Sequence, residues 1–115
     1  MAEERVIAKK TDWETEEMPK ERAHFRLLRH FTKEERENLK YGGIPQEMED
    51  RWFWYYEDDT LYIHRSWTGT CIFIVHFHFL TNLHEVTVNR DENQYSSSGT
   101  KEDLDLLNSL LDEWA

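Results

Sequence analysis

The sequence predicts an α+β fold in which an antiparallel four-strand meander, residues 51–90, is covered by a C-terminal helix and accompanied by short N-terminal helices. Residues 51–79 hold most of the aromatic side chains and alternate in the two-residue period of a strand. At 115 residues, the chain is long enough for one domain with one core. We expect this domain to span 23–115 and to follow a flexible, charged arm, 1–22. Near the C-terminus, apolar side chains recur at helical spacing: Leu104, Leu107, Leu110, Leu111 and Trp114.

The charge of the chain argues against several classes of partner. The formal net charge is −10, and residues 80–115 hold eight acidic side chains against two basic ones. Such a chain gains no counterion-release attraction to nucleic acid or to an anionic membrane, so we expect neither as a general partner.

The charged N-terminus predicts no signal peptide, and the lone cysteine, Cys71, predicts a buried thiol on the apolar sheet face. We therefore expect a cytoplasmic protein.

The first hairpin is predicted from the two aspartates at 58–59. Aspartate tolerates the left-handed backbone of a two-residue hairpin loop. This loop sets Trp54 opposite Ile63 and Trp52 opposite Arg65. One face of the hairpin is then apolar except for Arg65.

For the second hairpin two loops compete, and the apolar pattern decides between them. A two-residue loop, 68–69, would turn His76 and His78 into the apolar face. A three-residue loop, 67–69, ends on Gly69, where a left-handed residue is needed, and we therefore expect it. The opposite face, which we call the mixed face, then carries both aromatic rings and hydrogen-bonding groups, as the wall of a pocket does. Its members are Phe53, Tyr55, Tyr62, His64, Ser66, Ile72, Ile74, His76 and His78.

Short helical segments are predicted before the sheet. Pro19 is placed to open one, and Thr32 with Glu35 forms a capping box for another, 33–40. Pro45 permits one more helical turn before the first strand. We expect these segments at an edge of the sheet or partly over its mixed face.

After the third strand, residues 85–90 alternate and predict a fourth strand with Val86 and Val88 inward. A polar loop, 91–99, follows, and Thr100 caps the last helix. The leucine stripe of that helix is the natural cover for the apolar sheet face.

The histidines and Ser66 of the mixed face suggest two kinds of chemistry, which are proton transfer and metal binding. His64 and Ser66 are two apart on one strand, so their Cβ atoms lie roughly 7 Å apart, which is too far for direct proton transfer. We assign no catalytic residue and leave open whether the chain is an enzyme. His76 and His78 share a face, as in some zinc sites, and His64 is a third candidate ligand. Because such pairs are more often hydrogen-bonded surface residues, we expect no metal and no cofactor.

Arg65 is the one charged side chain on the predicted apolar face. An arginine among tryptophans either closes the sheet end, by stacking on a ring and pairing with a carboxylate, or binds an anion at a pocket mouth. Arg51 lies at the same end, and the adjacent loop offers Trp67, Thr68 and Gly69 to a phosphate or a sugar. The sequence leaves both interpretations open.

Several strings in this region carry a resemblance: Met48-Glu49-Asp50-Arg51-Trp52-Phe53, then Tyr55, then Leu61-Tyr62, and His64-Arg65-Ser66-Trp67-Thr68-Gly69. Together they resemble a small bacterial domain found beside ADP-ribose-handling enzymes, the macrodomain and ADP-ribosylglycohydrolase proteins. The resemblance covers residues 41–75. It implies a link to nucleotide or ADP-ribose metabolism and assigns no catalytic residue.

Two functions of different classes follow. The first is a domain that binds a small, anionic, nucleotide-like ligand, ADP-ribose being one example. The second is an acidic module that binds or inhibits a basic protein through the acidic residues after position 80. The residues expected to contact a small ligand are Arg51, Tyr55, Tyr62, His64, Arg65, Ser66, Trp67, Thr68 and Gly69.

Overall fold

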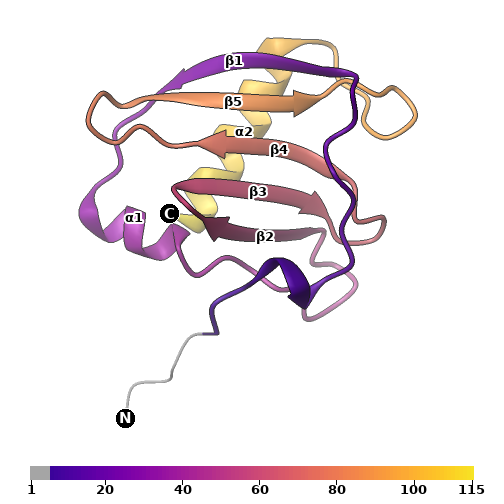
Figure 1. The fold of residues 1–115 in the computed structure, drawn as a ribbon, viewed down its shortest axis with the longest axis horizontal. Helices are drawn as coiled ribbons and strands as arrows, with labels where there is room; N and C mark the ends of the chain where they lie inside the picture. Colours follow the sequence, from indigo (N-terminus) through magenta and orange to yellow (C-terminus); the bar gives the residue numbers. More distant parts are fainter. Residues whose placement is uncertain (1–5) are drawn as a thin grey trace.

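The computed structural model describes residues 6–115 and shows one antiparallel sheet with helix α2 (Thr100–Trp114) across one face. The predicted α+β class is confirmed, but the sheet has five strands rather than four. Their order is β1-β5-β4-β3-β2, so the predicted meander is extended by β1 beside β5 (Figure 1). The strands are β1 (Arg22–Leu28), β2 (Trp52–Glu57), β3 (Thr60–Arg65), β4 (Cys71–His76) and β5 (Leu83–Asn89).

Strand β1 corrects the prediction that Pro19 opens a helix. Residues 22–28 alternate with a period of two, and Ala23, Phe25 and Leu27 pack against the core. All seven residues pair antiparallel with β5. The apolar cluster in this segment fits a strand as well as a helix, and pairing with β5 decides in favour of the strand.

The first hairpin has the predicted register. Trp54 pairs with Ile63 and Trp52 with Arg65. The two loop residues, 58–59, both have positive φ, at 51° and 56°, as a two-residue loop requires. The apolar face predicted for this hairpin is therefore confirmed.

The second hairpin contains a bulge that the sequence did not reveal. The predicted register holds as far as Ile63 and Phe73, after which His64 pairs with Cys71. Ile72 joins the core on the α2 side, and Cys71 lines a cavity on the other side of the sheet. The predicted faces of Cys71 and Ile72 are therefore wrong, because one extra residue reverses the side chains beyond it.

The predicted packing of the last helix is confirmed. Leu107, Leu110 and Leu111 are buried in the core beneath the sheet. The ring of Trp114 stacks on Trp54 with centroids 4.3 Å apart and planes 10° apart. The helix closes the apolar face of the sheet along its length.

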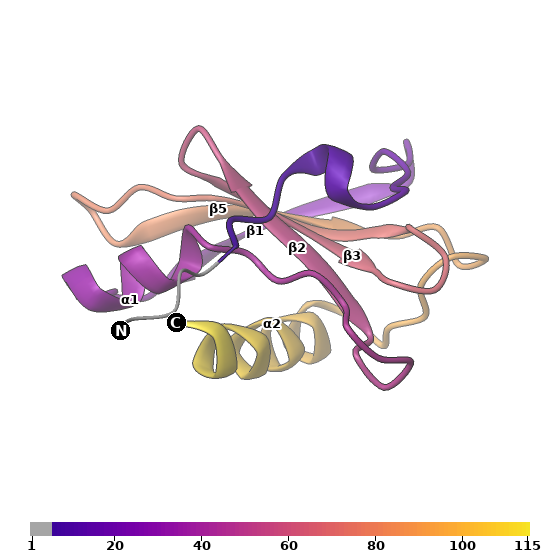
Figure 2. The ribbon, with the colours of Figure 1, turned by 90° about the horizontal axis from the view of Figure 1, so that it is seen from below.

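Helix α1 (Lys33–Leu39) begins with the predicted capping box, in which Thr32 and Glu35 exchange hydrogen bonds. Its Leu39 is fully buried in the same core, so α1 lies on the α2 side and not over the mixed face (Figure 2). The predicted helical turn after Pro45 does not form.

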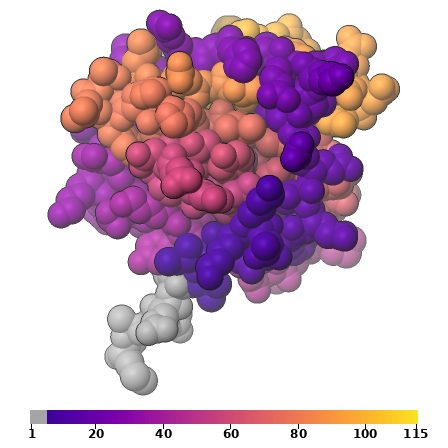
Figure 3. All heavy atoms as spheres, viewed as in Figure 1, coloured from indigo at the N-terminus to yellow at the C-terminus, as the bar shows by residue number. Residues whose placement is uncertain are grey.

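Residues 6–18, which we call the arm, lie on the face opposite α2, and residues 1–5 of the predicted flexible segment lie outside the described residues (Figures 2 and 3). The arm contains a 3-10 turn, Lys10–Asp12. Ala8 is buried, and its N–H donates to the carbonyl of Tyr41 at 2.7 Å. The arm therefore covers part of the mixed face.

Candidate functional site

The predicted ligand residues divide between the two faces of the sheet. His64 and Arg65 are consecutive in β3, so their side chains point in opposite directions. His64 lines a cavity under the arm together with Tyr55 and Tyr62, whereas Arg65 lines a hollow on the α2 side. The single site expected from the sequence is therefore two separate places.

The first place is a hollow of about 450 Å³ at the end of the sheet, which we call the arginine hollow. It lies where the β3–β4 loop meets the loop that precedes α2. Its volume lies in the range of small-molecule sites. The lining residues are Arg51, Arg65, Trp67, Thr68, Gln94, Tyr95 and Ser96.

Neither arginine of the hollow has an acidic partner among the described residues. The guanidinium carbon of Arg65 lies 4.5 Å from the centroid of a Trp52 ring. Among residues 6–115, no carboxylate lies within salt-bridge distance of Arg51 or Arg65. Of the two interpretations left open by the sequence, the structure contains the ring stacking but not the ion pair. No hydrogen bond or ion pair within residues 6–115 engages the donors of either guanidinium group, so both can receive an anion.

A buried polar network holds the back wall of the arginine hollow. The hydroxyl of Tyr95 donates to Asp103 at 2.9 Å, and Arg90 also donates to this fully buried carboxylate. Burial acts to raise the pKa of Asp103, but hydrogen bonds, foremost that from Arg90, outweigh it and lower the pKa. Burial and the bond to Asp103 raise the pKa of Tyr95 to about 12. Gln94 is fixed by a 2.9 Å hydrogen bond from Asn89.

Much of the His-Arg-Ser-Trp-Thr-Gly string serves the fold. The hydroxyl of Ser66 donates to the carbonyl of Asp50 at 2.7 Å, and the carbonyl of Ser66 accepts from the indole of Trp13 at 2.8 Å. The carbonyl of Gly69 accepts from the N–H of Glu16 at 2.8 Å. These bonds join the β3–β4 loop to the arm and to the segment before β2. Ser66 and Gly69 therefore have structural partners, apart from any ligand.

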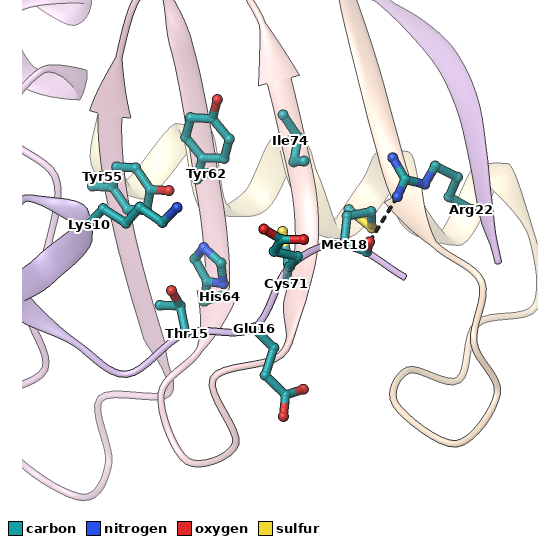
Figure 4. Close-up of a pocket in the computed structure, with 11 residues that line it drawn as sticks. Lys10, Thr15, Glu16, Met18, Arg22, Tyr55, Tyr62, His64, Cys71 and Ile74 are labelled. Carbon is teal, nitrogen blue, oxygen red and sulfur yellow. Dashed lines mark hydrogen bonds between the residues drawn. The ribbon is translucent and has the colours of Figure 1, made fainter. Parts of the chain in front are cut away.

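The second place is a cavity of about 420 Å³ between the arm and the sheet, which we call the arm cavity (Figure 4). Strands β2, β3 and β4 supply one wall and the arm supplies the other. The lining residues are Lys10, Thr15, Glu16, Glu17, Met18, Arg22, Tyr55, Tyr62, His64, Cys71 and Ile74.

His64 is held in one tautomer at the base of this cavity. Its Nδ1 lies 3.2 Å from the carbonyl oxygen of Gly69, which can only accept, so Nδ1 carries the proton. Its Nε2 is buried, and no described residue donates to it. Burial, more than any other effect, lowers the pKa of His64, so the ring is neutral at pH 7. Nε2 is therefore an acceptor that receives no hydrogen bond from residues 6–115.

The thiol and the Tyr55 hydroxyl of the arm cavity are protonated at neutral pH. Burial raises the pKa of the Cys71 thiol to about 12, so it is a weak nucleophile at neutral pH. Burial likewise raises the pKa of the Tyr55 hydroxyl, which stays a donor. The Tyr55 ring is nearly parallel to those of Tyr62 and His64, with interplanar angles of 12° and 9°. This cavity is built for hydrogen bonding and stacking.

The histidines considered as metal ligands each have another partner. His76 shares a hydrogen bond with Thr60 at 3.0 Å, and His78 pairs with Glu85 at 3.1 Å. Within residues 6–115, no group of three histidine, cysteine or acidic side chains is arranged to hold a metal ion. The histidines of the mixed face act as hydrogen-bonding residues in this structure.

The sequence did not predict the lining residues that distant segments contribute to the arm cavity and to the arginine hollow. Lys10 and Arg22 reach the arm cavity only because the arm and β1 lie beside β2–β4. Gln94 and Ser96 join the arginine hollow through the loop before α2. The lone aromatic residue of the arm, Trp13, was the one signal that this segment packs on the sheet.

Comparison with known proteins finds no relative: no protein-family model, no curated protein and no solved structure matches the chain. The resemblance of the His-Arg-Ser-Trp-Thr-Gly string to domains beside ADP-ribose-handling enzymes stays a prediction. Within residues 6–115, no helix has the length and apolar character needed to cross a membrane.

Proposed function

We propose that this chain is a binding module for a small, anionic, nucleotide-like ligand seated in the arginine hollow. The observation that carries the proposal is the pair of guanidinium groups, Arg51 and Arg65, which have no carboxylate partner within residues 6–115 although the chain has a net charge of −10. Guanidinium groups bind phosphate through charge-assisted, often bidentate hydrogen bonds. Stacking on Trp52 orients the Arg65 guanidinium before any ligand arrives.

The surroundings of the two arginines suit the rest of a nucleotide. The Trp67 side chain is 72% exposed, and its ring offers a surface on which a base can stack. Ser96 supplies a hydroxyl group that suits a sugar, whereas the Thr68 hydroxyl already donates to Thr70 and accepts from its N–H. ADP-ribose is the first ligand to test, because the motif resembles that of domains beside ADP-ribose-handling enzymes.

Calorimetry on the full chain tests this proposal. We expect ADP-ribose and AMP to bind, and ribose, which has no phosphate, not to bind. Arg51→Met and Arg65→Met should each weaken binding by roughly 1.5–3 kcal/mol, about the contribution of a hydrogen bond to a charged group. Arg26→Met removes the same charge from an exposed position on β1 and is the matched control, with binding unchanged. Absence of heat with every phosphate-bearing ligand would overturn the proposal.

The alternative function, an acidic module for a basic protein, is favoured by the exposed side of α2. The exposed acids there are Glu102, Asp105, Asp112 and Glu113. A pull-down at low and high salt separates the two functions, since capture of a basic protein should weaken at high salt. Failure to capture any basic protein at low salt would count against the alternative.

A further inference from the structure

We propose that the arm cavity is a second binding site, for a small uncharged planar ligand that donates an N–H hydrogen bond to Nε2 of His64. The site lies across the sheet from the arginine hollow and is independent of the function proposed there. It would select its ligand by hydrogen bonding and shape, whereas the arginine hollow would select by charge. The ligand class is a heterocycle with an N–H beside a carbonyl, as in a pyrimidine, an oxopurine or a lactam.

The first argument is the unused acceptor. His64 is 3% exposed, and its Nδ1 donates to the carbonyl of Gly69. Its Nε2 receives no hydrogen bond from any residue that the structure describes. Buried polar atoms nearly always have a hydrogen-bond partner, and an exception needs an explanation. A bound N–H group supplies the missing partner.

The second argument is the fixed orientation of the imidazole. The Gly69 carbonyl that holds Nδ1 also accepts from the N–H of Glu16, so the ring is anchored through this carbonyl to the arm. The ring lies 9° from the plane of Tyr55, which in turn stacks on Tyr62. A donor must approach Nε2 in the plane of the imidazole, and a flat ligand does so while lying along these rings.

The third argument is the balance of charge at the rim. Lys10 and Arg22 are offset by Glu16 and Glu17, so the cavity favours neither sign of charge. Arg22 is also engaged, because its side chain donates to two backbone carbonyls, at 2.7 and 2.8 Å. Inside the rim, the Tyr55 hydroxyl stays protonated and can donate to a ligand carbonyl. The interior therefore pairs a donor with an acceptor, which matches an N–H beside a C=O.

Access to Nε2 requires a side chain of the cavity wall to move. The nitrogen is covered, and Figure 4 shows the Lys10 side chain lying across Tyr55 near His64. Lys10 is exposed, and none of the hydrogen bonds found in residues 6–115 fixes its ammonium group. We expect the Lys10 side chain to move aside, which leaves intact the backbone hydrogen bonds that hold the arm, from Ala8 to Tyr41 and from Glu16 to Gly69.

The test is ¹⁵N NMR of the histidine rings in the full chain, with uracil and hypoxanthine as probes. We expect at least one of the two to move the Nε2 signal of His64 in a saturable way. The matched ligand control is 1,3-dimethyluracil, which keeps the ring and both carbonyls but has no N–H donor, and it should bind at least tenfold more weakly than uracil. Measurable and equal binding of uracil and 1,3-dimethyluracil, or no response to either uracil or hypoxanthine, would overturn the proposal.

Single substitutions determine whether the probe binds in the arm cavity or in the arginine hollow. His64→Phe keeps a flat ring and removes the acceptor, so it should weaken probe binding at least tenfold, whereas Arg65→Met should leave probe binding unchanged. Lys10→Ala should bind the probe at least as well as the parent chain. If His64→Phe does not fold, the comparison of uracil with 1,3-dimethyluracil on the unmodified chain decides. Loss of probe binding in Arg65→Met would place the ligand in the arginine hollow and refute a separate site.

Discussion

Replacing Arg65 by methionine separates a ligand-binding arginine from one that supports the fold. Methionine keeps much of the aliphatic stem and removes the guanidinium group. The chain contains a matched control in Arg90, which donates to the fully buried carboxylate of Asp103. The same substitution at the two positions should therefore have very different effects on the free energy of unfolding.

The expected magnitudes follow from the partners of each guanidinium. Arg65 stacks on Trp52 at 4.5 Å and has no carboxylate partner in the described part of the chain, so the loss is that of a partly exposed cation–π contact, about 0.5–1 kcal/mol. Arg90→Met leaves the charge of Asp103 buried and opposed only by neutral donors, which costs roughly 3–5 kcal/mol. The two variants should differ by at least about 2 kcal/mol.

The measurement is urea denaturation of the parent chain, Arg65→Met and Arg90→Met at pH 7, followed by tryptophan fluorescence. Equal slopes of the three unfolding curves are needed for the comparison of midpoints. A loss of 3 kcal/mol or more in Arg65→Met would refute the reasoning. It would mean that Arg65 neutralises a buried charge and that the His-Arg-Ser-Trp-Thr-Gly string is a signature of the fold alone.

Three further predictions concern the arm, the β3–β4 loop and pH. Trp13→Ala removes a half-buried ring stacked on Phe53 and a hydrogen bond to Ser66, so a denaturation curve should show a loss of roughly 2 kcal/mol; an unchanged curve would mean that the arm does not hold to the sheet. Gly69→Ala should cost at least about 1–2 kcal/mol in the same assay, because φ is +75° and the new Cβ would lie 2.5 Å from a backbone oxygen of the arm; a neutral effect would contradict the loop geometry. Burial is the main cause of the lowered pKa of His84, so the unfolded chain binds more protons below about pH 6.5 and stability should fall as pH drops from 7 toward 5. His84→Gln should make that decline shallower, and an identical pH profile in the variant would contradict the assignment.

Side-chain alternation was enough to predict strands β2–β5 and the face that α2 covers. The leucine stripe and the 58–59 loop fixed the packing and the first register, because both depend on local spacing. Strand β1 escaped prediction since its apolar residues fit two periods, and only pairing with β5 distinguishes them.

The candidate sites were predicted less well, for a geometric reason. Alternation correctly separated His64 from Arg65, but the prediction still gathered both into one site. The bulge then moved Cys71 into the arm cavity, and no local pattern announces a bulge of this kind. The arm and the loop before α2 complete the two places through contacts between segments far apart in the sequence, which periodicity does not report.

The most direct test of the central claim is an NMR titration of the ¹⁵N-labelled chain with ADP-ribose, read at the five tryptophan indole signals. Phosphate binding by Arg51 and Arg65 predicts saturable shifts of the indoles of Trp52 and Trp67, no shift with ribose, and loss of the shifts in the Arg51→Met/Arg65→Met double variant. Indole signals that do not move, or that move equally in the double variant, would contradict binding in the arginine hollow.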